Sequence, residues 1–294
     1  MDKDIIKVDT CIIGGSIAGL WTGLVLAKRG QNILVVDKDH IGALKHNLDV
    51  CINHSSNKSL LSIAQKSKQK WLDIKNSGSS ELNAEIRGSV SFALDHESLH
   101  SLNESIVCLK DLDPKDASFI IKDRTALKTL LDVNNIGEEV IAGLISVEDL
   151  ILENQNCLDF LRNKLIQNGA QFWGSDEIID YDLDGNTIKG LITKDALIET
   201  KNVVLASGAK SKLLVERLGL RMPIRPAKSH IIEYTSKSRL PKQILHFKTK
   251  FGDYISKPML NGRNLLTYTG QKIKFNQLGQ QMLTTKQLVI QWLK

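Results

Sequence analysis

Hydrophobic and polar positions fall into clear blocks over the first part of the chain. Residues 5–13 are rich in β-branched side chains and end at glycine, which is typical of a buried parallel strand. Residues 17–28 carry apolar side chains at helical spacing, and Gly30 follows them as a C-cap. A second apolar run, residues 33–36, ends at Asp37. This order predicts strand, glycine turn, helix, strand and acidic residue, the parts of a mononucleotide-binding βαβ unit.

The glycine turn has the spacing of a phosphate-binding fingerprint. It reads Gly14, Gly15, Ser16, Ile17, Ala18 and Gly19. Asp37 follows at about the 20-residue separation expected of a ribose-binding acid. The first glycine permits a tight turn, the last allows close helix packing, and Ser16 is small enough for a pyrophosphate to approach the backbone. The alternative is a buried βαβ unit whose glycine turn binds no ligand.

The uncharged run over residues 10–27 raises two other interpretations. Its length is at the lower limit for a membrane-spanning helix, about 17–25 residues, but its glycines would weaken such a helix and no second apolar run supports it. A signal peptide would begin with a positive segment, whereas Asp2, Lys3 and Asp4 give this chain a mixed start. We therefore expect neither a membrane span nor a signal peptide.

The pattern beyond Asp37 changes from mixed helices and strands to strands alone. We predict helices at residues 60–75, 97–103, 123–133 and 153–168, strands at 87–94, 170–173 and 200–206, and a hairpin over 176–195. Period-two alternation then predicts antiparallel strands at 229–236, 243–249, 253–260 and 264–270. The change after Pro223 indicates two domains, the second with an antiparallel sheet formed by residues 87–94 and 225–270.

Composition narrows the class of protein. The 294 residues are 42% hydrophobic and 24% charged, which is ordinary for a soluble globular chain. The net charge of +6 comes mostly from scattered lysines, and the densest group, residues 66–70, lies on a predicted helix. Because no aromatic residues are interleaved with these lysines, we interpret them as a solvated helix face and expect no nucleic-acid partner.

The cysteines give a prediction about metals and location. Cys11, Cys51, Cys108 and Cys157 form no C-x-x-C pair, so we expect no zinc site and no other metal. We expect the thiols to be reduced, which favours an intracellular, cytoplasmic protein.

Three further segments follow the βαβ unit in a recognisable order. They are "NKLIQNGAQFWGSDEIIDY", "VVLASGAKSKLLVERLGLRMPIRPAKSHIIEY" and "DYISKPMLNGRNLLTYTG". In this order the chain resembles the FAD-dependent D-amino-acid oxidase family, which includes glycine and sarcosine oxidases and related amine dehydrogenases. The resemblance covers nearly the whole chain, and "VVLASGAKS" followed by "PIRPAKSH" is its more specific part.

The resemblance implies an α/β fold with two domains. A discontinuous, Rossmann-type FAD-binding domain would take residues 1–85 and 150–222. An α+β substrate domain with an antiparallel sheet would take residues 86–149 and 223–280. A C-terminal helix would follow at residues 281–294.

The resemblance also implies FAD as the cofactor. The pyrophosphate would lie on the amides of Ser16, Ile17, Ala18 and Gly19, since the donors and the dipole of a helix N-terminus favour an anion. Asp37 would accept hydrogen bonds from the ribose hydroxyls.

Two further segments would complete the cofactor site by resemblance. Lys38 would flank the adenine, and Ile178 would give it a backbone contact. Ala206, Ser207 and Gly208 would let the end of a strand approach the cofactor. The alternatives are that Ile178 is a plain core residue and that Ser207 and Gly208 form a simple turn.

The loop "GALKHNLDV" departs from the family pattern. Relatives usually have small residues and a glycine facing the flavin ring at this point. Asn47 matches the asparagine of the family, but Leu48 and Asp49 stand where small residues are expected. His46 lies near the position at which some relatives attach FAD covalently, and the alternative is an exposed loop histidine.

The end of the chain is a second departure. Relatives continue past the position equivalent to Gly270 with a segment that covers the flavin ring, whereas this sequence ends in "TTKQLVIQWLK", a predicted helix. We expect either that a protein partner completes the flavin site or that the chain is a truncated product that binds flavin poorly or not at all.

The function that the resemblance implies is oxidation of an amine or amino acid, with hydride transfer from the carbon beside nitrogen to FAD. Such an oxidoreductase needs no dedicated protein base if the amine arrives neutral, so we assign no catalytic residue. A substrate carboxylate would call for an arginine, for which Arg225, Arg239 and Arg263 are candidates and surface residues the alternative.

Two other functions remain open. The chain is alternatively a non-catalytic or partner-dependent subunit with a flavin fold. The segment "GGSIAG" also suits a flavin monooxygenase, but such an enzyme would carry a Gly-Asp segment late in the chain, and none with the expected flanks is present.

Overall fold

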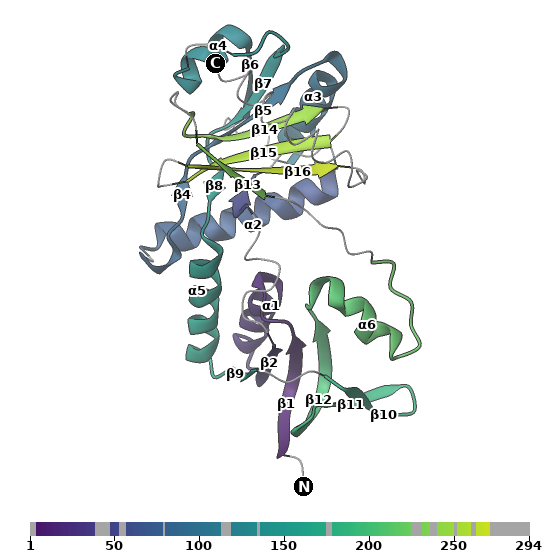
Figure 1. The fold of residues 1–294 in the computed structure, drawn as a ribbon. Coiled ribbons are helices and arrows are strands. Elements are labelled where there is room, and N and C mark those ends of the chain that lie inside the picture. The colour runs from purple at the N-terminus through teal and green to yellow at the C-terminus, as the bar shows by residue number, and fades with distance from the viewer. Residues whose placement is uncertain are drawn as a thin grey trace. The chain divides into compact units, whose positions relative to one another are not determined.

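The computed structural model of the chain divides into two compact units (Figure 1). The first unit comprises Met1–Asn47 and Asn154–Lys228, and the second comprises Leu48–Glu153 and Ser229–Lys294. The structure describes residues 4–38, 48–52, 57–78, 80–112, 119–133, 136–174, 178–224, 231–235, 240–249, 252–259 and 263–270.

The division differs from the expected domain limits by a few residues at 150–153 and 223–228, and by a longer stretch over residues 48–85. We expected this longer stretch in the FAD-binding domain, but it belongs to the second unit. Helix α2 (Lys58–Asn76) packs on helix α3 (His96–Leu112) of that unit, and Lys58 Nζ lies 3.1 Å from Asp111 Oδ2. The helix expected at 281–294 lies outside the described residues.

A six-stranded sheet forms the centre of the first unit, in the order β10-β11-β12-β1-β2-β9. Its strands are β1 (Asp4–Ile13), β2 (Ile33–Asp37), β9 (Gln171–Gly174), β10 (Asp180–Asp184), β11 (Thr187–Ile192) and β12 (Ala196–Leu205). The four strands from β12 to β9 are parallel, while β10 and β11 add an antiparallel hairpin at one edge. The four parallel strands therefore end at a common carboxyl edge.

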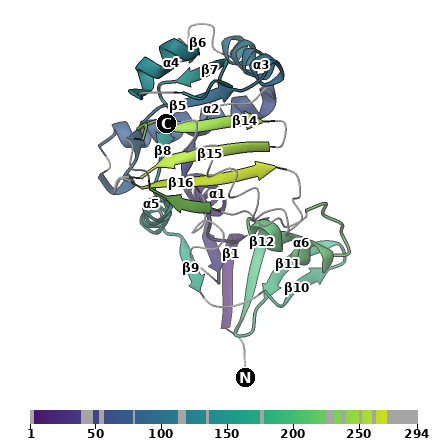
Figure 2. The ribbon, with the colours of Figure 1, turned by 45° about the horizontal axis from the view of Figure 1, so that its top comes forward.

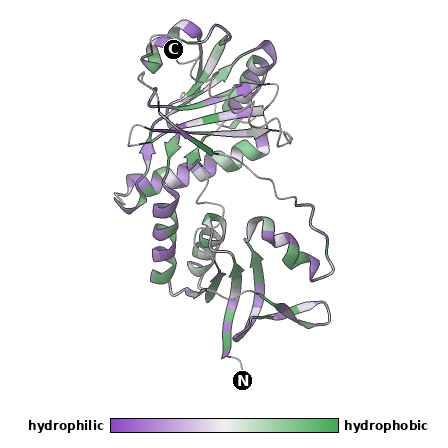
Figure 3. Cartoon of the chain, in the orientation of Figure 1, coloured by the Kyte–Doolittle hydropathy of each residue, from purple (hydrophilic) through white to green (hydrophobic). Residues whose placement is uncertain are grey.

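Both faces of the central part of this sheet are covered, which explains why β2 and the C-terminal half of β1 are mostly apolar. Helices α1 (Ile17–Ala27) and α5 (Asn154–Gln167) pack together on the face that carries Ile12 and Ile33. The other face buries Cys11 among apolar residues of β2, β11 and β12. Figure 3 shows the resulting hydrophobic colour along the C-terminal halves of β1 and β12.

A seven-stranded sheet dominates the second unit, in the order β13-β16-β15-β14-β5-β7-β6 (Figure 2). Its strands are β5 (Ser89–Ala93), β6 (Phe119–Asp123), β7 (Ala142–Ser146), β13 (Ile231–Tyr234), β14 (Ile244–Thr249), β15 (Gly252–Pro258) and β16 (Asn264–Gly270). A smaller three-stranded sheet joins β3 (Val50–Cys51), β8 (Leu150–Ile151) and β4 (Glu85–Ile86). The predicted antiparallel pairing holds for the large sheet except between β14 and β5, which run parallel.

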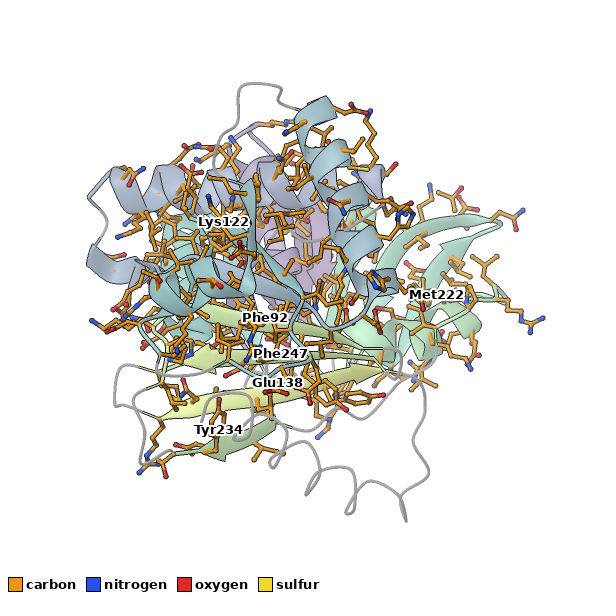
Figure 4. All side chains as sticks on the ribbon, turned by 90° about the horizontal axis from the view of Figure 1, so that it is seen from above. Phe92, Lys122, Glu138, Met222, Tyr234 and Phe247 are labelled. Carbon is orange, nitrogen blue, oxygen red and sulfur yellow. The ribbon has the colours of Figure 1, made fainter. Side chains whose placement is uncertain are left out.

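Helices cover the large sheet on both faces. On one face Leu102 and Leu109 of α3 pack with Ala93 and Leu144. On the other, residues of helix α4 (Arg124–Leu131) join a cluster with Phe92 and Phe247. These two rings stack with centroids 4.8 Å apart, and Figure 4 shows them reaching one another from adjacent strands.

A buried ion pair fixes the turn between β7 and β8. Asp149 is fully buried, and its Oδ1 lies 3.4 Å from Nζ of Lys68 on α2, whose side chain is 7% exposed. Ser89 donates a 2.6 Å hydrogen bond to Asp149 Oδ2, and Arg87 N and Gly88 N donate to its main-chain oxygen. The pair therefore ties α2, β5 and the turn before β8 together.

Candidate cofactor site

The turn between β1 and α1 is closed by contacts that leave no room for a side chain. Gly14 has φ +114°, which favours glycine, and its amide donates to Val36 O at 2.9 Å. A Cβ added to Gly14 would lie 2.5 Å from the carbonyl oxygen of Ala206, and one added to Gly19 would overlap the carbonyl oxygen of Gly14. The glycine spacing therefore brings the ends of β1, β2 and β12 and the start of α1 together.

Helix α1 presents its N-terminus beside this turn. Ser16 is the N-cap, and within the described residues its side chain makes no capping hydrogen bond. The first turn consists of Ile17, Ala18, Gly19 and Leu20, all uncharged. The first amides of a helix have no intrahelical acceptor and lie at the positive end of its dipole. This geometry suits a phosphate group.

Asp37 ends β2 directly against the turn. Its Oδ2 would lie 2.5 Å from a Cβ added to Gly15, so the carboxylate rests against a position that has no side chain. Asp37 is half-buried and Lys38 is exposed. A carboxylate here can accept hydrogen bonds from hydroxyl groups of a ligand lying on the turn.

The end of β12 forms the third side of the cradle. Ala206 N donates to Ile13 O at 2.8 Å, which holds Ala206 beside the glycines. Gly208 has φ +57°, and the Oγ atoms of Ser207 and Ser211 lie 2.9 Å apart. Ala206 and Ser207 are partly buried and Gly208 is exposed, so small residues alone border the cradle on this side.

Ile178 is a core residue in the connection before β10, and its backbone is held by a side chain from a distant segment. Its side chain is 3% exposed and packs with Cys11 and Tyr181. Its carbonyl oxygen accepts a 2.7 Å hydrogen bond from Arg217 Nη1, which also donates to the carbonyl oxygen of Ile179. No local pattern in the sequence singles out Arg217, because this contact joins segments that are distant along the chain.

Four other candidate residues cannot be placed relative to the cradle, and a fifth lies elsewhere. His46, Asn47, Arg225 and Arg239 lie outside the described residues. Arg263 Nη1 donates to Glu233 Oε1 at 2.7 Å on an exposed surface of the second unit. The guanidinium of Arg263 is therefore already paired with a carboxylate.

The segment that opens the second unit begins with an apolar residue that faces inward. The side chain of Leu48 is buried, with 4% of its surface exposed. Asp49 has φ +57°, and its main-chain oxygen accepts from Leu152 N at 2.8 Å. The two residues that depart from the family pattern therefore lie at the start of the second unit.

The described residues give little support for a metal site, a membrane span or a reactive cysteine. They contain no group of three His, Cys, Asp or Glu side chains that could hold a metal ion. No helix among them is both long and apolar enough to cross a membrane. All four cysteines are thiols, and burial raises the pKa of Cys11 to about 12, which keeps it protonated and unreactive.

The sequence matches the model of a known family, described as FAD dependent oxidoreductase (DAO), over residues 9–287. The chain belongs to this family. The expected resemblance to D-amino-acid oxidases is thus confirmed, as is the Rossmann-type α/β class of fold.

The curated relatives that this chain matches are distant in sequence. A D-amino acid dehydrogenase of Rhizobium rhizogenes is 23% identical over 276 residues, covering 74% of this chain and 65% of the relative. A subunit of the opine oxidase of Rhizobium meliloti is 24% identical over 245 residues, covering 79% of this chain and 64% of that protein. The matched region thus spans about two thirds of these relatives.

Solved structures agree on the fold. L-proline dehydrogenase from P. horikoshii has a TM-score of 0.80 at 17% identity, covering 97% of this chain and 78% of that chain. Glycine oxidase from Geobacillus kaustophilus has a TM-score of 0.77 at 18% identity, covering 92% and 73%. At such identities the likeness shows the fold alone.

The cradle itself fits the cofactor of the family. A dinucleotide needs backbone amides for its pyrophosphate, an acceptor for its ribose and close approach without side chains. The first amides of α1, the Asp37 carboxylate and the glycines of the turn meet these three needs in one place.

Proposed function

We propose that this chain binds FAD in its first unit and oxidises the carbon–nitrogen bond of an amine or amino acid. The observation that carries the proposal is the glycine cradle at the carboxyl edge of the parallel sheet, with Asp37 against Gly15. The names of similar proteins support the substrate class, since they include D-amino acid dehydrogenase, glycine oxidase and L-proline dehydrogenase.

We assign the nucleotide half of the cofactor to the described cradle. The amides of residues 16–19 would receive the pyrophosphate, and Asp37 the ribose hydroxyls. Lys38 would flank the adenine, with a backbone contact from Ile178. The other residues that we propose to border the cofactor are Ala206, Ser207, Gly208, His46 and Asn47.

The chemistry that FAD supplies when bound is acceptance of a hydride, which converts an amine to an imine that water hydrolyses. The role of the polypeptide is to bind the cofactor and the substrate and to orient them. We propose the second unit as the substrate domain. Because Arg263 is already paired with Glu233, it is a weak candidate for holding a substrate carboxylate.

A second candidate function is that of one component in a larger oxidase. The similarity to a protein named as a subunit of opine oxidase supports it, because that name describes part of a multi-subunit enzyme. In this case a protein partner would complete the flavin site.

We further propose a cytoplasmic location. The four thiols support it, because disulfides are rare in a reducing compartment.

The cofactor assignment is tested by the visible spectrum and by the affinity for FAD. The unaltered chain should take up FAD and show flavin absorbance. Asp37→Ala should bind FAD about 10- to 100-fold more weakly, because charge-assisted hydrogen bonds of about 1.5–3 kcal/mol are lost. Asp184→Ala is the matched control, since it removes an exposed carboxylate of the same unit that ends β10. Equal affinities for all three proteins would reject the assignment.

The reaction is tested with the FAD-loaded chain and an artificial electron acceptor. A panel of D-amino acids, glycine, L-proline and an opine should include a substrate. Turnover by the isolated chain favours the first candidate function. FAD binding without turnover, together with turnover once a co-purified protein is added, favours the second.

A further inference from the structure

One connection in the first unit joins the two edge strands of the sheet, β9 and β10. Strand β9 ends at Gly174, which is paired in register with Asp37, while β10 begins at Asp180 at the opposite edge. Ile178, in this connection, and Tyr181, just after it, pack on the sheet face opposite α1. The connection therefore leaves the carboxyl edge beside Asp37, where the nucleotide is proposed to bind.

A second segment shares that face. Helix α6 (Ser211–Glu216) follows Gly208 at the end of β12, after the short helix η3 (Gly208–Lys210). Leu214 and Leu218 pack against the same cluster as Ile178. Both segments thus start at the carboxyl edge and meet on one face of the sheet.

Three hydrogen bonds join the two segments. Tyr181 donates its hydroxyl to Leu214 O at 3.1 Å. Arg217, the C-cap of α6, donates from one nitrogen to the carbonyl oxygens of Ile178, at 2.7 Å, and of Ile179. Ile179 N also donates to Ile192 O at 2.8 Å. Two consecutive carbonyls directed at one guanidinium nitrogen fix the orientation of both peptide planes.

We propose that Arg217 is a positioning residue for recognition of the adenine. This inference rests on the proposed function, in which Ile178 contacts the base through its backbone. A backbone can distinguish the hydrogen-bonding edge of one base from another only when its peptide planes are held in one orientation. Arg217 supplies that restraint from α6, and the restraint acts on specificity for the base more than on the phosphates bound by α1.

The experiment measures the affinities of the full chain for ADP and for IDP, which differ at the 6-position of the base. The unaltered chain should prefer ADP. Arg217→Met keeps the aliphatic part of the side chain but removes the donors. It should weaken ADP binding about 3- to 10-fold, as expected for an exposed, charge-assisted contact, and bring the ADP-to-IDP ratio toward one.

Two further variants separate positioning from other effects. Arg217→Lys keeps a charged donor and should recover part of the ADP preference. Arg221→Met removes a nearby exposed arginine and should leave both affinities unchanged, which controls for the loss of positive charge.

The outcomes are distinguishable. If the unaltered chain binds neither ADP nor FAD, the proposed function fails and the inference fails with it. If it binds both but shows no preference for ADP, or if Arg217→Met keeps the ratio, the inference alone is overturned. An equal loss of ADP and IDP affinity in Arg217→Met also overturns it, because that result indicates a general structural defect.

Discussion

Two glycines of the first unit allow the steric demand of the cradle to be separated from backbone strain. Gly14 and Gly30 both have positive φ, +114° and +83°. A Cβ at Gly14 would lie 2.5 Å from Ala206 O and 2.9 Å from Ser207 N, both main-chain atoms. Among the described residues, no atom lies within 4 Å of a Cβ added to Gly30. Alanine at Gly30 therefore introduces strain alone, and alanine at Gly14 adds a clash with β12.

The magnitudes follow from these contacts. Left-handed backbone geometry costs an alanine about 1–2 kcal/mol, which is the expected loss of unfolding free energy for Gly30→Ala. Gly14→Ala must also displace backbone that cannot rotate away, and overpacking of this kind costs about 1–3 kcal/mol more. We expect Gly14→Ala to lose about 2–5 kcal/mol and to abolish FAD binding, because the end of β12 moves away from the turn.

Urea denaturation of the FAD-free proteins measures the first effect, and titration with FAD measures the second. Gly30→Ala should keep the affinity for FAD of the unaltered chain, because Gly30 lies beyond the C-terminus of α1. The reasoning is refuted if Gly14→Ala is no less stable than Gly30→Ala, or if it binds FAD normally.

Two further predictions concern buried ionisable groups. Lys68→Met should lower the unfolding free energy by about 3–5 kcal/mol, because it leaves the carboxylate of Asp149 buried without its cation. In urea denaturation the double variant Lys68→Met/Asp149→Leu should recover part of this loss, and a loss below about 1 kcal/mol in the single variant would contradict the expected burial cost. Burial raises the pKa of Cys11 from 9.0 to about 12. Above pH 9 the unfolded chain therefore releases this proton while the native chain keeps it. Stability should then fall with rising pH by up to about 1.4 kcal/mol per pH unit. Cys11→Val should show a shallower fall between pH 8 and 10.5, and equal slopes would disprove the assignment.

The βαβ unit could be predicted from sequence because its signals are local. The predicted segments at 5–13, 17–28 and 33–36 correspond to β1, α1 and β2. Residues 10–13 of β1 and 33–36 of β2 are buried, so the residues there are mostly apolar, and the glycine turn marks the boundary between strand and helix.

Elements stabilised by tertiary contacts were harder to predict. The helix expected at 97–103 extends to Leu112, since burial of Leu109 outweighs the weak helix propensity of its serines. Strands β6 and β7 were not predicted. Strand β7 contains Gly143, where an added Cβ would lie 2.9 Å from Leu127 Cδ1, so the glycine that obscures the strand pattern is required by packing.

The order and direction of the strands in the large sheet depend on contacts between distant segments, and the alternation of apolar and polar residues does not reveal those contacts. The period of two correctly indicated strands at β13 to β16, but it says nothing about which neighbour each strand pairs with. The parallel pair of β14 and β5 joins Phe247 to Phe92, and the whole Asn154–Lys228 part of the first unit lies between them in sequence. The contact of Arg217 with Ile178 escapes sequence reasoning for the same reason.

The glycines of the fingerprint are required for different reasons. They therefore differ in how strongly each one indicates a bound ligand. Gly14 and Gly19 are required by the polypeptide itself, because side chains there would meet Ala206 and the backbone of the turn. A βαβ unit that bound nothing would need them as well. Gly15 differs, because the atom that a Cβ would meet is the carboxylate of Asp37, at 2.5 Å. A flexible carboxylate could move aside at little cost to the fold. The pairing of Gly15 with Asp37 is therefore the part of the motif that the fold does not require and that the proposed nucleotide site would explain.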